Sequence, residues 1–371
     1  MEFTINQRVL RDELDFVQGV VEKKSTIPVL ANVLIETVGK DGVRITGTDL
    51  DVTLRCAASA TVKEEGAICI QAKRLFDVVR LLSDGDVHFV KEDNDWVRMR
   101  SGKSKYRLAG VSREQFPEVP NFVDGTLKLS AEALTRFIHA TSFAISSEAS
   151  RFTLSGAKFM LGGGSAKMVT TDGHRLALIG ADGLAMNGTD GTLDALIPQK
   201  ALTALVKMCR NADGSVTFGE DPNHLYFDVN GRQLSARRLS GTFPNYEMLL
   251  PKETDRMVTV DVAEFLVAAK RVIPMANENT RSLTLTITEE AIEVSAASSE
   301  AGEAAESLGI EVVKGDGETV LALNGNYLIE YLSSADSGRL AMGFSDNTPV
   351  TFEKVGDDGY SGVHLIMPLR M

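Results

Sequence analysis

The chain repeats one pattern three times, and this repeat limits the possible folds more than any other feature. A short apolar run leads into a helix-like stretch in ICIQAKRLFDVVRLL, ALIPQKALTALVKMC and VLALNGNYLIEYLSS. When Ile70, Ile197 and Leu323 are aligned, the copies are 127 and 126 residues apart. Solenoid repeats have periods of about 20–50 residues, so this period is too long for a solenoid. It predicts three tandem domains of one kind.

Other segments keep the same period. Phe116 in QFPEVP and Phe243 in TFPNYE are 127 residues apart, and GTDLDVTL near Asp49 resembles TTDGHRLAL near Asp172. Each third also opens with an amphipathic stretch: NQRVLRDELDFVQGVVEK, SAEALTRFIHATSFAIS and DVAEFLVAAKRVIPMA. These stretches predict a second helix in every third.

The residues around these helices predict an α+β fold. Ser130 and Asp261 are suitable N-caps for the second and third opening helices. Alternating runs such as VRITGT, HLYFDVN and SLTLTIT predict short strands, about eight in each third, with turns at GKDG and VNGR. Each third is therefore predicted to be two helices packed on antiparallel sheets. The expected domains are residues 1–121, 126–251 and 255–371, with breaks in PEVPNFVDG and LLPKETD.

The charge of the chain is acidic overall, but its cations gather on the predicted helices. The net charge of −12 argues against nucleic acid unless the basic residues share one surface. Acidic residues collect mostly in turns and at strand ends. The basic helix faces are either ordinary solvated surfaces or one surface that follows a polyanion, and no base-reading motif is present. The candidate DNA contacts are Lys24, Lys73, Arg74, Arg80, Arg136, Lys200, Lys207 and Arg210.

The stretch VTTDGHRLAL brings Asp172, His174 and Arg175 together, which raises the question of catalysis. No GxSxG nucleophile elbow occurs, and SGKSK lacks the first glycine of a phosphate-binding loop because Val97 stands there. No HExxH occurs either. Asp172 followed by Gly173 is instead typical of a tight turn between two strands. We expect no catalytic residue, no metal and no cofactor.

Cysteine content and hydropathy indicate a cytoplasmic protein. Cys56, Cys69 and Cys209 form no CxxC pair, so neither a disulfide framework nor a zinc site is expected. No apolar run approaches the roughly 20 residues that a membrane helix needs. The N-terminal MEFTINQRVLRDELD carries charges throughout and does not resemble a signal peptide.

Across its whole length the chain resembles the bacterial DNA polymerase III beta subunits, the DNA sliding clamps. The resemblance depends on the three repeats, the length, and the segments STIPVLANVLIE, RLSGTFPNYEMLLP, TTDGHRLAL and HLIMPLRM. It implies a head-to-tail homodimer whose six similar domains close a ring around duplex DNA, with helices inside and sheets outside. It also implies a non-catalytic processivity factor of the polymerase holoenzyme, associated with the nucleoid.

The resemblance further implies an apolar site for a short hydrophobic-aromatic peptide motif. The proteins expected to carry this motif are the DNA polymerase III alpha subunit, the clamp-loader delta subunit, other DNA polymerases, mismatch-repair proteins and DNA ligase. At the edge of this site, Met248 and Thr280 stand where a better-studied member of the family has a basic and an aromatic residue, respectively. The implied site residues are Leu154, Thr171, Gly173, His174, Arg175, Leu176, Pro244, Met248, Leu249, Asn324, Tyr327, Leu365, Ile366, Met367, Pro368, Leu369, Arg370 and Met371.

The resemblance also implies a dimer seam formed by edge-to-edge strand pairing. The expected seam residues are Lys105, Tyr106 and Leu108 in the first third, and Ile273, Pro274 and Met275 in the last. Two other functions remain open from the residues alone. One is an acidic scaffold that binds peptides without encircling DNA, and the other is a hydrolase built around His174.

Overall fold

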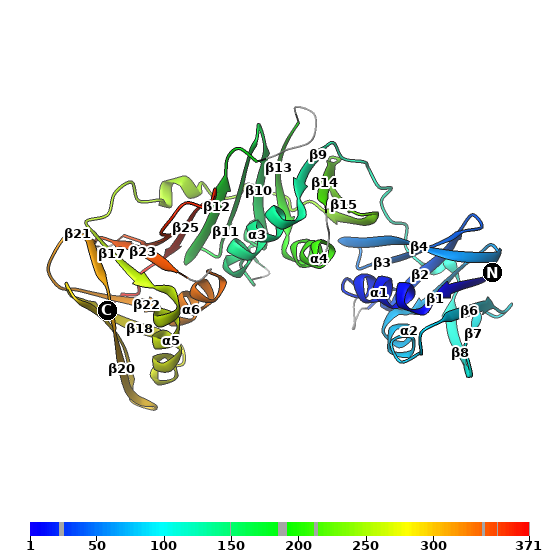
Figure 1. The fold of residues 1–371 in the computed structure, drawn as a ribbon, viewed down its shortest axis with the longest axis horizontal. Helices are drawn as coiled ribbons and strands as arrows, with labels where there is room; N and C mark the ends of the chain where they lie inside the picture. Colours follow the sequence, from blue (N-terminus) through cyan, green and yellow to red (C-terminus); the bar gives the residue numbers. More distant parts are fainter. Residues whose placement is uncertain are drawn as a thin grey trace. The chain divides into compact units, whose positions relative to one another are not determined.

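The computed structural model describes residues 1–21, 26–148, 150–184, 191–210, 214–335, 338–346 and 348–370. Two predicted site residues, Lys24 and Met371, lie outside these ranges. The described residues pack into two compact units (Figure 1). One is built mainly from Met1–Thr135 and Lys200–Arg238, and the other from 136–184, Thr192–Gln199 and 239–370.

The first third of the chain lies in the first unit. The side chain of Asn6 caps its opening helix by accepting a hydrogen bond from the Arg8 amide. Helices α1 and α2 lie side by side (Figure 1) and turn apolar faces such as Leu10 and Leu75 inward. Its elements are β1 Glu2–Asn6, α1 Gln7–Val17, η1 Pro28–Ala31, β2 Asn32–Val38, β3 Gly42–Thr48, β4 Val52–Glu64, β5 Ala67–Gln71, α2 Ala72–Val79, β6 Asp86–Lys91, β7 Trp96–Ser101, β8 Ser104–Val111 and η2 Arg113–Gln115.

The middle third contributes elements to both units. Its opening helix begins after Ser130, whose hydroxyl accepts a hydrogen bond from the Ala133 amide at 3.1 Å, as expected of an N-cap. Its elements are β9 Leu127–Ser130, α3 Ala131–Thr141, η3 Ser142–Ala144, η4 Phe152–Leu154, β10 Gly156–Gly162, β11 Ser165–Thr171, β12 Arg175–Ala181, β13 Thr192–Pro198, α4 Gln199–Cys209, β14 Ser215–Glu220, β15 His224–Val229, β16 Arg232–Arg237 and η5 Tyr246–Leu249.

The last third lies in the second unit. Asp261 caps α5 by accepting from the amides of Ala263 and Glu264, and Asn324 caps α6 in the same way. Its elements are β17 Arg256–Asp261, α5 Val262–Val272, η6 Ile273–Met275, β18 Ser282–Ile287, β19 Ala291–Ser298, β20 Gly302–Gly309, β21 Glu311–Lys314, β22 Thr319–Asn324, α6 Gly325–Ser334, β23 Arg339–Phe344, β24 Val350–Lys354 and β25 Ser361–Ile366.

The element order confirms the predicted repeat and the α+β class. A strand leads directly into the opening helix in β1–α1, β9–α3 and β17–α5. A strand leads into the second helix in β5–α2, β13–α4 and β22–α6, where the three copies were aligned. In the described part of the chain each third therefore has the two expected α-helices.

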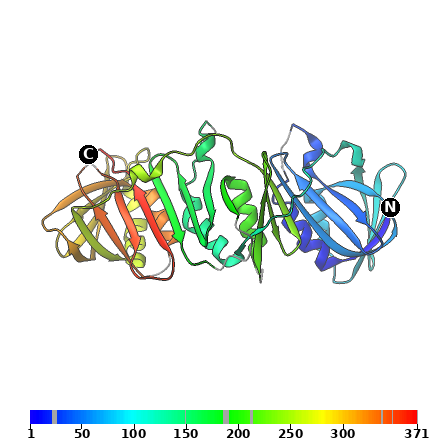
Figure 2. The ribbon, with the colours of Figure 1, turned by 90° about the horizontal axis from the view of Figure 1, so that it is seen from above.

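The last strand of each later third completes a sheet of the third before it. β16 pairs antiparallel with β4, and β25 pairs antiparallel with β12. Figure 2 shows the second case, with the red strands beside the green ones. The middle third consequently belongs partly to each compact unit, and the three domain boundaries remain a prediction. Of the helices in the described ranges, none is long and apolar enough to cross a membrane.

Candidate functional site

The segment between β11 and β12 forms the turn that its sequence predicted. Asp172 Oδ1 accepts hydrogen bonds from the amides of His174 at 2.9 Å and Arg175 at 3.0 Å. The Thr171 hydroxyl donates to the Arg175 carbonyl at 2.6 Å, and Gly173 has φ +90°. The Asp172 carboxylate thus organises the turn.

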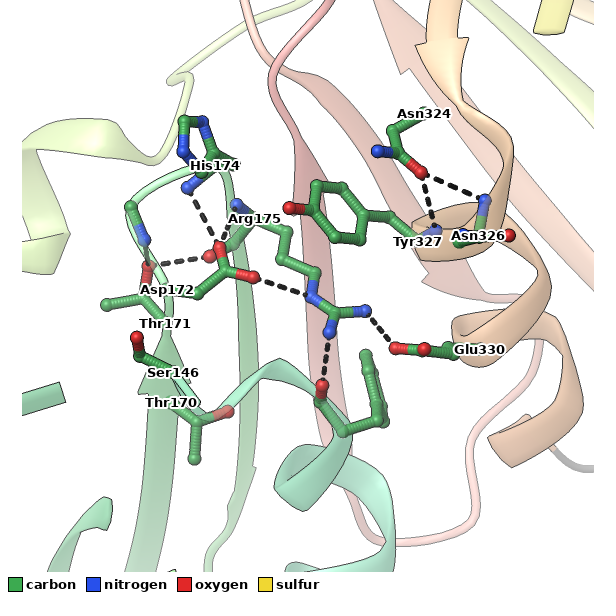
Figure 3. A network of polar contacts seen from close by, with 12 residues as sticks. Ser146, Thr170, Thr171, Asp172, His174, Arg175, Asn324, Asn326, Tyr327 and Glu330 are labelled. Atoms are coloured by element: carbon green, nitrogen blue, oxygen red, sulfur yellow. Dashed lines mark hydrogen bonds and ion pairs between the residues drawn. The ribbon is translucent and has the colours of Figure 1, made fainter. Parts of the chain in front are cut away.

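The guanidinium of Arg175 is buried inside the second unit, and each of its three nitrogens donates a hydrogen bond (Figure 3). Its Nε donates to Asp172 Oδ2 at 3.1 Å, its Nη1 to Glu330 Oε2 at 2.6 Å, and its Nη2 to the Phe143 carbonyl. Its carbon lies 4.3 Å from the centre of the Tyr327 ring. We call Arg175, Asp172, Glu330, Phe143 and Tyr327 the Arg175 network. It joins β12 to α6.

An apolar cluster lies beside this turn. Leu154, Leu176 and Leu365, all predicted site residues, are buried against Phe243 and Tyr246. Leu176 stands opposite Leu365 in the β12–β25 ladder. Three segments far apart in sequence therefore meet in one apolar cluster.

Large apolar side chains at the edge of this cluster are exposed to solvent. Met248 is 81 % exposed, Met367 43 % and Leu249 42 %, and Pro244 is also exposed. The Met367 amide donates to the His174 carbonyl at 2.9 Å, which fixes the tail beside the turn. Exposed apolar groups that border a buried apolar cluster are typical of a binding surface.

The other predicted site residues lie on the tail and on α6. Asn324 uses its side chain to cap α6, so its oxygen is engaged there. Ile366 is buried in β25, while Pro368 and Leu369 are half-buried and Arg370 is exposed. The Leu369 amide donates to the Ala322 carbonyl at 2.7 Å.

Four contributors to this region carry no local sequence signal. Phe143 and Glu330 hold Arg175, Tyr246 packs in the apolar cluster, and Arg151 Nη1 donates to the Asp172 carbonyl at 2.7 Å. Glu330 follows Arg175 by 155 residues, so the pairing cannot be read from spacing.

A buried histidine lies under the Arg175 network. The ring of His364 stacks on Tyr331 at 4.4 Å and meets the edge of Phe143 at 5.2 Å. Burial, helped by the positive charge of Arg175, lowers the pKa of His364 to about 3. The imidazole is therefore neutral at physiological pH and acts as an aromatic core residue.

The cations of α2 are exposed, and two of them share one carboxylate. Lys73 Nζ lies 3.3 Å and Arg80 Nη2 3.0 Å from Asp77. Arg74 is exposed on the same helix. Exposed pairs of this kind contribute little stability, so all three side chains are free to exchange partners.

The cations of α4 lie on its solvent face, with Leu202 and Leu205 buried on the other. Lys207 and Arg210 are exposed. Lys200 pairs with the carboxylate of Asp49 in the first unit.

Arg136 is engaged within the second unit. It pairs with Asp358, and its guanidinium carbon lies 3.9 Å from the centre of the Tyr360 ring. Arg136, in addition to Lys354, lowers the pKa of Asp358 to about 2 through hydrogen bonding. These contacts leave Arg136 a weaker DNA-contact candidate than Lys207.

The predicted seam is a strand edge in the first third only. Lys105, Tyr106 and Leu108 lie on β8, whose residues 104–109 pair with β7 on one side and with no described strand on the other. Ile273, Pro274 and Met275, the seam residues expected in the last third, do not lie on a strand. These residues form the 3₁₀ helix η6, where proline lacks the amide hydrogen that a ladder needs. The last third also contains a four-stranded sheet in the order β20-β19-β18-β22, and β20 is one of its two edge strands.

Comparison with known proteins covers the whole chain. Residues 1–120, 128–245 and 247–370 match the N-terminal, central and C-terminal domains of the DNA polymerase III beta subunit. The chain belongs to this family. The beta sliding clamp of Chlamydia pneumoniae is 30% identical over 373 residues, covering 100% of this chain and 99% of that protein.

Solved beta-subunit structures share the fold. The sliding clamp of Bartonella birtlesii bound to griselimycin has a TM-score of 0.92 and 28% identity, with 100% of both chains covered. The DNA polymerase III subunit beta of Pseudomonas aeruginosa has a TM-score of 0.91 and 27% identity, again with 100% of both chains covered. The predicted family is thereby confirmed.

Proposed function

We propose that this beta subunit is a non-catalytic processivity factor of the DNA polymerase III holoenzyme. Two copies close a ring around duplex DNA and tether the replicative polymerase without reading sequence. The observation that carries this proposal is the match of all three domains over the whole chain. A cytoplasmic, nucleoid-associated location follows from that role.

The partner site is the surface formed by the apolar cluster and its exposed edge. A short hydrophobic-aromatic motif would cover Met248, Leu249 and Met367 and rest on Leu176 and Leu365. Flexible methionines suit a surface that must fit several ligands. The expected ligands come from the alpha subunit, the clamp-loader delta subunit, other polymerases, mismatch-repair proteins and ligase. Griselimycin, which is bound in the Bartonella structure, is expected to occupy the same surface.

The dimer seam follows from the way sheets are completed within the chain. β4, the fourth strand of the first third, pairs with β16. β12, the fourth strand of the middle third, pairs with β25. The fourth strand of the last third, β20, has a free edge, and so has β8, the last strand of the first third. A head-to-tail dimer pairs β20 with β8 of the partner subunit.

The repeat also predicts the register of this seam. Ser235 of β16 stands opposite Thr53 of β4. When Phe116 is aligned with Phe243, Leu108 of β8 corresponds to Ser235 of β16. Gly302 of β20 corresponds to Thr53 of β4, because each is the first residue of its strand to pair after the preceding turn. Gly302 should therefore face Leu108 of the partner subunit. A charged residue at position 108 is expected to yield monomers in sedimentation analysis.

The DNA surface is expected to include the exposed cations of α2 and α4, namely Arg74, Lys207 and Arg210. Lys73 and Arg80 can leave Asp77 for phosphate at little cost. Contacts of this kind weaken with salt and let a ring slide.

Linearisation of the DNA tests the proposed function. The protein is loaded onto nicked circular DNA with its clamp loader and isolated by gel filtration, and the circle is then cut at one site. A ring is expected to stay on the circle and to leave after the cut, because only topology holds it. Retention after cutting would contradict the proposal. A peptide-binding scaffold would not remain on the circle at all.

A further inference from the structure

We propose that Arg175 and Glu330 are positioning residues of the partner site. They set the separation between the Thr171–Arg175 turn and α6, and they hold the Tyr327 ring as a wall of the site without contacting the ligand. The inference deepens the proposed function and rests on it. The resemblance placed Arg175 among the ligand contacts and did not include Glu330.

The engagement of Arg175 argues for a positioning role. Each of its three nitrogens has a protein acceptor, and its side chain is only 7% exposed. Because so little of the side chain is exposed, the guanidinium would have to turn away from Asp172, Glu330 and the Phe143 carbonyl to face a ligand. Breaking such charge-assisted bonds costs more than one new surface bond returns.

The ring of Tyr327 depends on this arrangement. Figure 3 shows the ring extending from α6 toward the turn, across the Arg175 side chain. Its centre lies 4.3 Å from the guanidinium carbon, within cation–π distance. Glu330 lies one helical turn after Tyr327, so the two side chains share a face of α6. Loss of the Glu330 charge would weaken the bond to Nη1 and give both the guanidinium and the ring more freedom to move.

The network also reaches the tail. Asp172 binds Arg175 through Oδ2 while its Oδ1 holds the His174 amide. The carbonyl of His174 in turn accepts from the Met367 amide. The guanidinium thus links the turn to the helix, and the hydrogen bond between Met367 and His174 extends this link to the tail.

The first third contains the same turn with a different ion pair. Asp49 Oδ1 accepts from the amides of Asp51 at 3.0 Å and Val52 at 2.6 Å, and the Thr48 hydroxyl donates to the Val52 carbonyl at 3.2 Å. Here Lys200 of α4 pairs with the Asp49 carboxylate. Helices α4 and α6 are repeat equivalents, so the chain twice joins this turn to this helix by an ion pair.

Peptide affinity in the full-length protein tests the proposal. The probes are a fluorescein-labelled peptide containing leucine and phenylalanine, and griselimycin. Glu330→Gln should weaken both about tenfold, mainly through faster dissociation, which corresponds to about 1.4 kcal/mol. Glu330→Asp should restore part of the affinity. The control is Glu293→Gln, which removes an exposed carboxylate from β19 in the same unit and should leave affinity unchanged.

A double-mutant cycle separates positioning from general destabilisation. Once Tyr327→Leu has removed the ring, Glu330→Gln should have little further effect on peptide affinity, whereas general destabilisation would add in full. Additive effects, or wild-type affinity in Glu330→Gln, would overturn the positioning role. If the wild-type protein binds neither probe, the proposed partner site itself is wrong.

Discussion

Replacing Gly173 with alanine should loosen the turn at the partner site by an amount that the structure allows to be worked out. Gly173 has φ +90°, a conformation that costs an L-residue about 1–2 kcal/mol. An added Cβ would also lie 2.8 Å from Arg151 Nη1 and push it from the Asp172 carbonyl, which costs roughly 0.5–1.5 kcal/mol. The reduced freedom of the unfolded chain returns about 0.4–1 kcal/mol. The expected net loss of folding stability is about 1–2 kcal/mol.

The chain offers a matched control in the hairpin between β10 and β11. Gly164 has φ +79°, and an added Cβ would meet nothing within 4 Å. Gly164→Ala therefore carries the backbone strain without the displacement of Arg151. The difference between the stability losses of Gly173→Ala and Gly164→Ala isolates the contact with Arg151. This difference should be about 1 kcal/mol.

Amide hydrogen exchange is the appropriate assay, because a chain with two packing units need not unfold in one transition. The diagnostic amides are those of Arg175 and Met367, whose acceptors are Asp172 Oδ1 and the His174 carbonyl. In Gly173→Ala they should exchange at least fivefold faster than in Gly164→Ala. Equal exchange in the two variants would refute the argument that Arg151 occupies the space beside Gly173.

Three further outcomes are expected. Changing Lys207 and Arg210 to glutamate should reduce loading on circular DNA. In salt titrations of DNA binding, the slope of log K against log salt concentration should fall by up to about 0.9 for each lost phosphate contact. Lys167→Glu on the sheet should change neither loading nor slope. His364→Phe should make stability less sensitive to acid. In wild type, the unfolded state takes up a proton below the ordinary histidine pKa of about 6.5, whereas the pKa of His364 in the folded state is about 3. The folding stability of wild type should therefore fall as pH drops through this window, by about 2 kcal/mol at pH 5 in urea titrations. Leu50→Gly should stabilise the first unit by up to about 1 kcal/mol in calorimetry, because Leu50 has φ +81° in the turn where the middle third has glycine.

The sequence predicted those parts of the fold that depend on local chemistry. The repeat, the N-caps at Ser130 and Asp261 and the turn at Asp172 are determined by residues within a few positions of one another, and the structure confirms each of them. Strand alternation and helix periodicity are local in the same sense.

Interactions between distant segments could not be predicted in this way. The resemblance placed Arg175 among the site residues, but its partner Glu330 is 155 residues away and could not be found from spacing. The sequence placed Ile273, Pro274 and Met275 at the dimer seam but did not show that they form η6, where the backbone follows α5 and Pro274 cannot donate to a ladder. Arg136 was expected on a DNA face, but Asp358 and Tyr360 from the last third hold it.

Because β16 completes the sheet edge left by β4, and β25 the edge left by β12, no module is finished by its own residues. During synthesis the ribosome must release residue 237 before the first module's open edge is covered inside the chain, and residue 366 before the second's. The emerging polypeptide therefore has an unpaired strand edge for most of its translation. Chaperone occupancy should fall in two steps, one when residue 237 and one when residue 366 has been released. In the proposed dimer the third edge, on β20, would be covered only by another molecule, and self-association would then be the final folding event.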